Sequence, residues 1–162
     1  MITEYRSVSL CYLSTNLSLL ANLDTIATIY QPKENTYHLV LSNVDYTQVN
    51  DFPTEKTLSS STSKAKNLIW LEISPYRVIM TQQNQHELNY RHFWEKGVYG
   101  ITRYWLNQQT GNQIKQDKIQ LRNFTRDLTV KGAFIPESLR IEYELWTDKL
   151  NLGNYILHLE IK

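Results

Sequence analysis

Basic and aromatic side chains lie close together in the third quarter of this sequence. Arg103, Tyr104 and Trp105 are consecutive, and Lys118 and Arg122 follow on the next apolar-alternating segment. Cationic side chains contact phosphate oxygens, and aromatic rings stack on bases. The pattern therefore indicates a contact surface for RNA or for another phosphate-bearing partner.

The charge of the chain supports the same segment. Residues 96–140 carry eight basic and three acidic side chains, a net charge of +5, whereas residues 1–95 carry seven basic and nine acidic ones and the whole chain is only +1. A free nucleic-acid-binding protein is usually more basic than this. The distribution favours a local contact surface within a larger assembly, which would supply the remaining affinity.

We predict that seven residues contact RNA or a protein partner. They are Arg103, Tyr104, Trp105, Lys115, Lys118, Arg122 and Arg126. If residues 98–106 form a strand, Arg103 and Trp105 share one face, and Tyr104 lies on the other. The alternative is a solvated sheet face on which Lys and Arg protect an edge from aggregation.

The sequence lacks the motifs of common enzymes. Its four histidines form no His-x-x-x-His pair, its single cysteine rules out a Cys-x-x-Cys site, and no Gly-x-Ser-x-Gly motif is present. Glu142 and Glu144 alternate with apolar residues, which is typical of an outer strand face, and His158 would make a cross-strand polar contact there. We expect no enzymatic activity, no metal and no cofactor.

Composition and periodicity predict a mainly β protein. Tyr occurs 11 times and aromatic residues make up 12% of the 162 residues, a length typical of one domain. We expect a single antiparallel β-rich domain over residues 1–162, with one or two short helices at residues 14–29 and 86–94. Strands are predicted at residues 4–13, 36–46, 67–74, 76–81, 98–106, 114–124, 139–146 and 151–161, and a flexible loop at residues 47–66.

Cys11 is the only cysteine, so the chain cannot form an internal disulfide. It lies in a strand-like run, which favours a buried, unreactive thiol. No apolar run is long enough to span a bilayer, and residues 1–6 do not resemble a signal peptide. We expect a cytoplasmic protein that does not contact a membrane.

One segment resembles a known family. Gly100-Ile101-Thr102-Arg103-Tyr104-Trp105-Leu106, then Gln109-Thr110-Gly111, then Ile119-Gln120-Leu121-Arg122 is similar to a hairpin of small accessory subunits of type III CRISPR effector complexes. The resemblance covers about 25 residues. It implies a non-catalytic subunit that packs against other protein subunits near the guide or target RNA.

Two other classes remain open at the level of sequence. A lipocalin-like barrel would bind a small ligand or chromophore, and its cavity could be lined by Trp70, Trp94, Trp105 and Trp146. A purely structural protein of an assembly would present exposed strands and aromatic patches. An apolar interior that binds a ligand in the isolated protein would favour the barrel.

Overall fold

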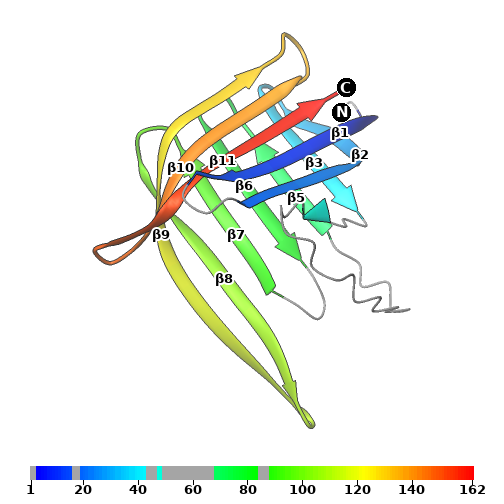
Figure 1. The fold of residues 1–162 in the computed structure, drawn as a ribbon. Coiled ribbons are helices and arrows are strands. Elements are labelled where there is room, and N and C mark those ends of the chain that lie inside the picture. Colours follow the sequence, from blue (N-terminus) through cyan, green and yellow to red (C-terminus); the bar gives the residue numbers. More distant parts are fainter. Residues whose placement is uncertain (1–2, 16–18, 43–46, 49–67, 84–87) are drawn as a thin grey trace.

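The computed structural model describes residues 3–15, 19–42, 47–48, 68–83 and 88–162, and the chain is antiparallel β throughout these residues (Figure 1). Eleven strands and no helix occur in them. None of the described elements is a helix of the length and apolarity needed to cross a membrane. The expectation of a mainly β fold is confirmed.

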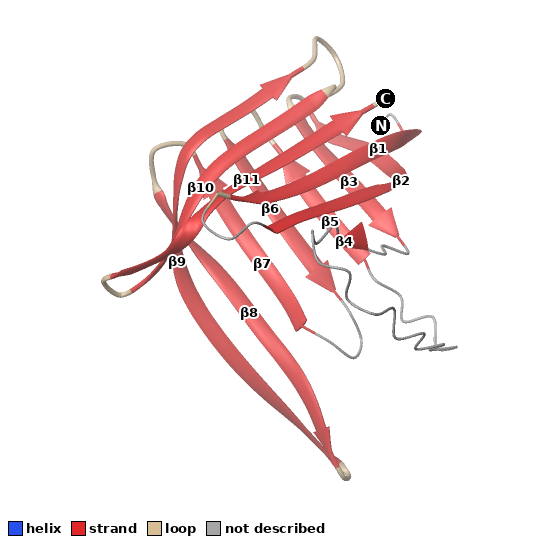
Figure 2. Cartoon of the chain, viewed as in Figure 1, coloured by secondary structure: helices blue, strands red, loops and turns tan. Residues whose placement is uncertain are grey.

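The strands follow one another along the chain with short turns between most of them (Figure 2). Their bounds are β1 Thr3–Ser14, β2 Leu19–Lys33, β3 Thr36–Ser42, β4 Thr47–Gln48, β5 Leu68–Ile73, β6 Arg77–Gln83, β7 Leu88–Glu95, β8 Tyr99–Thr110, β9 Gln113–Lys131, β10 Ser138–Thr147 and β11 Leu150–Ile161.

The sheet closes into a barrel because β1 pairs on both of its edges. It is antiparallel to β2 on one side, where Leu10 is opposite Leu23, and to β11 on the other, where Leu10 is opposite Leu159. The order β1-β11-β10-β9-β8-β7-β6-β5-β3-β2 therefore returns to β1, and β4 adds a short pairing beside β2. Closure satisfies the edges that an open sheet would leave unpaired.

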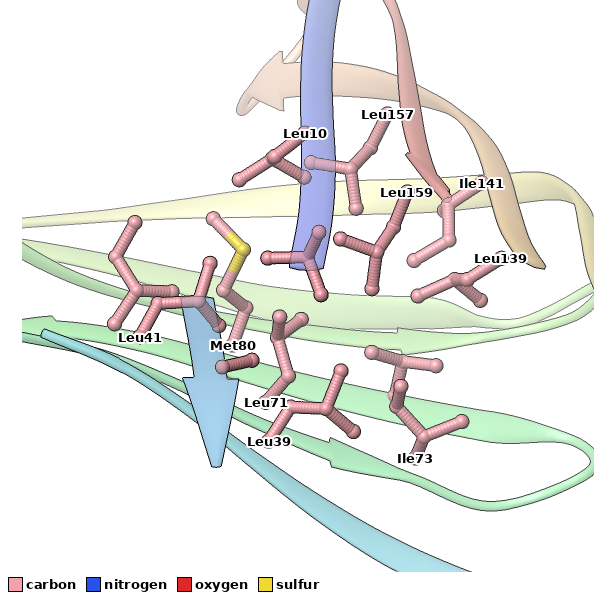
Figure 3. Packing of buried hydrophobic residues seen from close by; sticks show 14 of the residues in the cluster. Leu10, Leu39, Leu41, Leu71, Ile73, Met80, Leu139, Ile141, Leu157 and Leu159 are labelled. Carbon is pink, nitrogen blue, oxygen red and sulfur yellow. The ribbon is translucent and has the colours of Figure 1, made fainter. Parts of the chain in front are cut away.

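The core fills the inside of this barrel. Alternate residues point inward on each strand, as the period of two requires, and those of β1, β3, β5, β10 and β11 interdigitate as aliphatic side chains (Figure 3). On β11, Leu157 and Leu159 are 0% exposed while Tyr155 and Ile161 are partly buried, so the inward alternation predicted for this strand is confirmed. Each fully buried Leu or Ile contributes about 1.5–3 kcal/mol to folding.

The expectation of short helices is wrong. The first expected helix, residues 14–29, lies largely in β2, and the second, residues 86–94, lies largely in β7. Thr25, Ile26, Thr28 and Ile29 are β-branched and prefer strands, and β2 has hydrogen-bonding partners on both edges. The apolar spacing at Leu13, Leu17 and Leu20 was a weaker guide than these pairings. In the 86–94 segment, the inward set Tyr90, His92 and Trp94 follows a period of two rather than 3.6.

The two predicted late hairpins are present. β8 and β9 are joined at Gly111-Asn112, and β10 and β11 at Asp148-Lys149. The loop predicted at residues 47–66 lies outside the described residues apart from Thr47 and Gln48, which form β4 opposite Asn22 and Ala21.

The β8–β9 hairpin extends well beyond the barrel wall (Figure 1). β7 pairs with β8 only as far as Leu106, and β10 pairs with β9 only from Arg122 onward. Among the described residues, no third strand lies beside residues 107–110 of β8 or residues 113–121 of β9. We refer to residues 107–121 as the arm. The base of the arm meets the barrel beside Arg103, Trp105 and Arg122.

Candidate nucleic-acid interface

The outer surface of β7, β8 and β9 carries a group of cations that face solvent together. Thr102 is buried on the inner side of β8, so Arg103 and Trp105 on the neighbouring positions point outward. The strand register places Trp105 opposite Lys118, and Ile101 opposite Arg122. We refer to Arg91, Arg103, Lys118 and Arg122 as the outer basic face.

Arg91 and Arg103 are directly opposite each other on β7 and β8. Both are exposed, and among the described residues no carboxylate lies within ion-pair distance of either guanidinium. With Phe93, Tyr99, Gly100 and Ile101 they line a shallow groove of about 420 Å³. Like charges directly opposite in a sheet destabilise it, so this pair favours an anion between the two side chains.

Aromatic rings accompany these cations on the same surface. Tyr99 is 57% exposed, and the guanidinium carbon of Arg122 lies 5.6 Å from the centre of its ring. Phe124 packs against Tyr99 with ring centres 4.9 Å apart. The guanidinium of Arg122 also donates a hydrogen bond to the backbone carbonyl of Asp148, which ties β9 to the β10–β11 turn. Tyr99 therefore presents a supported ring to solvent.

The close approach of the β7 and β8 backbones at Gly100 shapes the groove beside Arg91 and Arg103. A Cβ atom at this position would collide with the backbone carbonyl oxygen of Phe93. β7 and β8 pair regularly from Leu88–Leu106 to His92–Thr102. At Gly100 the two backbones approach so closely that only glycine fits. This contact forms the floor between Phe93 and Ile101.

Three of the seven predicted contact residues are not on the outer basic face. Tyr104 points inward with Thr102, and burial raises the pKa of its hydroxyl to about 12. Lys115 is exposed on the arm, but it is three residues from Lys118 and therefore lies on the opposite face of β9. Arg126 pairs with Glu144 on β10, with Nη1 and Oε1 3.8 Å apart. Arg103, Trp105, Lys118 and Arg122 are brought together as the alternation predicts.

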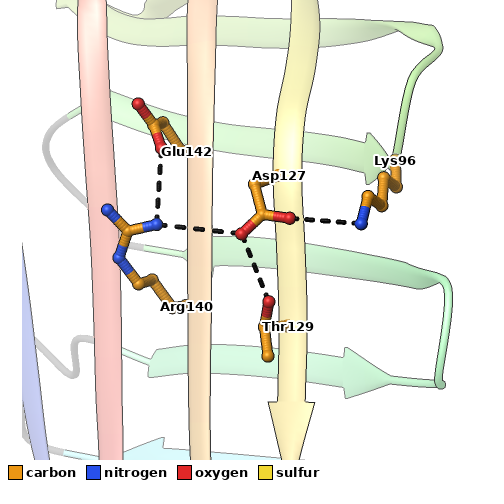
Figure 4. Close-up of polar contacts among 5 residues, drawn as sticks. All are labelled: Lys96, Asp127, Thr129, Arg140 and Glu142. Carbon is orange, nitrogen blue, oxygen red and sulfur yellow. Dashed lines mark hydrogen bonds and ion pairs between the residues drawn. The ribbon is translucent and has the colours of Figure 1, made fainter.

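Two further cations of the basic segment are held by an acidic partner. Asp127 lies between Lys96, whose Nζ is 3.3 Å from Oδ1, and Arg140, whose Nη1 is 3.8 Å from Oδ2 (Figure 4). The hydrogen bond from Lys96 holds the pKa of the Asp127 carboxyl below its ordinary value. Arg140 also contacts Glu142 at 3.3 Å. The net charge of +5 therefore overstates the positive charge that is free to meet a partner.

The sequence analysis missed Arg91 and did not single out Tyr99. Arg91 lies outside the basic segment, in the stretch expected to be a helix, and only the β7–β8 register brings it opposite Arg103. The position of Arg91 between Tyr90 and His92, which both point inward, was the signal in the sequence that could have placed Arg91 on the outer face.

A second group of polar residues lies inside the barrel, and we refer to it as the interior cluster. His92, Trp94, Thr102, Asn123 and Thr125 are all buried. Thr102 Oγ1 accepts a hydrogen bond from Asn123 Nδ2 at 2.7 Å and lies 2.9 Å from His92 Nδ1. Thr102 thus links His92 on β7 to Asn123 on β9 through one hydroxyl group.

Aromatic rings surround His92. It stacks on Trp94 with ring centres 4.8 Å apart, and Tyr90, Tyr104 and Tyr143 lie 5.0, 5.7 and 5.8 Å away. Burial lowers the pKa of His92 to about 3, so the ring is neutral at physiological pH. No ion pair reaches it among the described residues. The interior cluster is therefore polar but uncharged.

The remaining candidates for chemistry have structural partners. Glu142 and Glu144 lie on the outer face of β10 and pair with Arg140 and Arg126, as an outer strand face requires. His158 contacts Glu160 at 3.2 Å on its own strand rather than either of them. Within the described residues, no group of His, Cys, Asp and Glu could hold a metal ion.

Cys11 is partly buried on β1, and burial raises the pKa of its thiol above the usual value. A raised pKa lowers the thiolate fraction at neutral pH, and only the thiolate is a strong nucleophile. The geometry supports the reading of an unreactive thiol.

The fold, the interior cluster and the outer basic face together define a closed antiparallel β-barrel whose interior is partly aliphatic and partly aromatic. No protein-family model matches this sequence, and no curated protein does either. The structure is similar to the crystal structure of the ywiB protein from Bacillus subtilis, with a TM-score of 0.60 over 99% of this chain and 93% of that one. The two sequences are 13% identical, so the similarity concerns the fold alone.

Proposed function

We propose that this chain is a non-catalytic, cytoplasmic subunit of a larger assembly and that it contacts single-stranded RNA through the outer basic face. The observation that carries the proposal is the opposed pair Arg91 and Arg103, which no described carboxylate neutralises. A phosphate between the two guanidinium groups would remove their repulsion and accept charge-assisted hydrogen bonds from both.

The dimensions of the face suit a short single strand. Three neighbouring strands span about 10 Å, and the distance along β9 from Lys118 to Arg122 is about 13 Å. This area accommodates about two or three phosphates. Tyr99, with 57% of its surface exposed, and the half-buried Trp105 lie on the same face of β8 and offer rings for unpaired bases.

The arm supports the assembly part of the proposal. Its backbone edges have no partner strand among the described residues, and Ile119 is 58% exposed on it. An exposed edge with apolar side chains is the kind of surface that pairs with another protein chain. The far end of the arm would reach a neighbouring subunit, while the outer basic face, including Lys118 at the base of the arm, would contact the RNA. The resemblance to type III CRISPR accessory subunits implies a subunit that packs against other subunits near RNA.

The proposal is tested by fluorescence anisotropy with a labelled 12-nucleotide oligouridylate. With three phosphate contacts, the logarithm of the binding constant should fall against the logarithm of salt concentration with a slope of about −2. The isolated protein should bind weakly, with a Kd on the order of 10–100 µM. A 12-base-pair RNA duplex should bind more weakly, because its bases cannot stack on Tyr99 or Trp105.

The discriminating variant is Arg91→Glu/Arg103→Glu/Lys118→Glu. Its matched control, Lys33→Glu/Lys131→Glu/Lys149→Glu, makes the same change in net charge at exposed lysines elsewhere. We expect the first to abolish measurable binding with little change in Tm and the control to retain most of it. Equal loss of binding in both variants, or tighter binding of the 12-base-pair RNA duplex than of the single strand, would refute a dedicated RNA-binding face.

A further inference from the structure

Three polar atoms inside the barrel have no hydrogen-bond partner among the described residues. They are Nε1 of Trp94, Oδ1 of Asn123 and Oγ1 of Thr125, and all three side chains are 0% exposed. Buried polar atoms are nearly always hydrogen-bonded, so each exception requires an explanation. Here three exceptions occur in one region of one barrel.

The strand pairings place these atoms around the same interior space. Thr125 is opposite Tyr143, whose ring centre is 5.1 Å from that of Trp94. Asn123 is opposite Gly100 and bonded to Thr102, which in turn contacts His92. The three residues with unpartnered atoms therefore lie within the interior cluster, on the neighbouring inward positions of β7 and β9.

The surroundings are aromatic, and their outer members are partly exposed. Tyr12, Tyr90, Tyr104 and Tyr155 point inward on their strands, yet each keeps part of its surface exposed. Tyr155 stacks on Tyr143 with ring centres 5.4 Å apart. The aliphatic part of the core, in contrast, is fully buried at Leu39, Leu71, Leu139 and Leu159. The four tyrosines thus border the buried interior cluster and connect it to the surface of the barrel, whereas the aliphatic part of the core has no such exposed border.

We propose that the aromatic part of the barrel interior binds an uncharged, planar aromatic molecule that carries both a hydrogen-bond acceptor and a hydrogen-bond donor. Trp94 Nε1 donates to the acceptor, and Asn123 Oδ1 accepts from the donor. Thr125 Oγ1 can do either. The inward tyrosines pack against the faces of the ring. This site is separate from the outer basic face and does not depend on the RNA proposal.

The same features exclude other ligand classes. A charged molecule would lose its hydration without gaining a counter-charge, because the interior cluster is neutral. A fatty chain would leave the three polar atoms unpartnered, so it would not relieve their desolvation. The hydrogen-bond donors and acceptors of Trp94, Asn123 and Thr125, rather than the size of the barrel, therefore favour a ring with polar atoms over other ligands.

The probe is 2-quinolinone, a planar lactam with an adjacent N–H and C=O, titrated into the intact protein. We expect saturable binding by calorimetry together with a shift of the Trp94 indole N–H resonance in nitrogen-15 NMR spectra. Naphthalene, which has no polar atoms, should bind at least roughly threefold more weakly, and 2-naphthoate should not bind. The smaller lactam 2-pyridone tests whether ring size limits entry.

Thr125→Val tests the site without disturbing packing. It should weaken 2-quinolinone binding about 2- to 12-fold, leave naphthalene binding unchanged and raise the Tm of the free protein, because an unpartnered hydroxyl is removed. Thr129→Val is the matched control, since its hydroxyl contacts Asp127 at 3.2 Å on the outer side of the same strand. Failure of both lactams to bind, or a lower Tm for Thr125→Val, would overturn the proposal.

Discussion

Acid should destabilise this protein through His92, beginning near pH 6.5. The ring is 3% exposed, and burial lowers its pKa to about 3 from an ordinary value of 6.5. Between these two values the unfolded chain binds a proton that the folded protein does not. The free energy of unfolding must therefore fall as the pH falls from 6.5 toward 3, and the contribution is fully present above pH 6.5.

The size of the effect follows from the two pKa values. Each pH unit inside the window lowers the free energy of unfolding by about 1.4 kcal/mol. From pH 7.5 to pH 5.0 the loss from this group is about 2 kcal/mol, which for a chain of this length lowers Tm by roughly 4–8 °C. Asp127, whose pKa lies below its usual 3.8, affects stability only at lower pH.

The assay is urea unfolding at pH 7.5, 6.5, 5.5 and 5.0, with His92→Gln as the comparison. Gln keeps an acceptor for Thr102 and has no titration in this range. The difference in unfolding free energy between the two proteins should shrink by about 2 kcal/mol from pH 7.5 to 5.0. If the two proteins lose stability in parallel over this range, His92 is not a buried neutral histidine, and the account of the interior cluster fails.

Two further substitutions, each with a matched control, test the barrel itself. Leu157→Asp should leave little folded protein, because burying an unpaired carboxylate at a side chain that is 0% exposed costs more than about 4 kcal/mol. Ile156→Asp, on the outward face of the same strand, should fold. Circular dichroism of the purified proteins distinguishes the two outcomes. Gly100→Ala should lower stability by about 1–3 kcal/mol, since its Cβ meets the Phe93 carbonyl. Gly111→Ala, at φ +62° with open space around it, should cost only about 1 kcal/mol in the same urea titration.

The strands near the C-terminus were predictable because their signal is local. Tyr155, Leu157 and Leu159 occupy alternate positions of one run, and the turn-forming residues at 107–112 separate two other alternating runs. The same period-two rule placed Arg103 and Trp105 on one face and Tyr104 on the other. These features depend only on residues close together in sequence.

The interior cluster and the Arg91–Arg103 pair were not predictable in this way. Trp94 was considered as a cavity residue, but His92, Asn123 and Thr125 are polar and carry no sign of burial in a single sequence. They become interior only when β1 pairs with β11 and the sheet closes. Residues 86–94 were interpreted as a helix, and that error hid the outward position of Arg91. Non-local pairing decided both cases.

The position of β1 between β2 and β11 has a consequence for synthesis on the ribosome. β1 can pair with β2 early, but its other edge waits for β11, which lies far along the chain, with Val8 finally opposite Ile161. At about 5–20 residues per second, that edge stays open for roughly 7–30 s. During this interval the nascent chain is an open sheet whose exposed edge can pair with a neighbouring chain, so slow translation near the end should favour aggregation over closure.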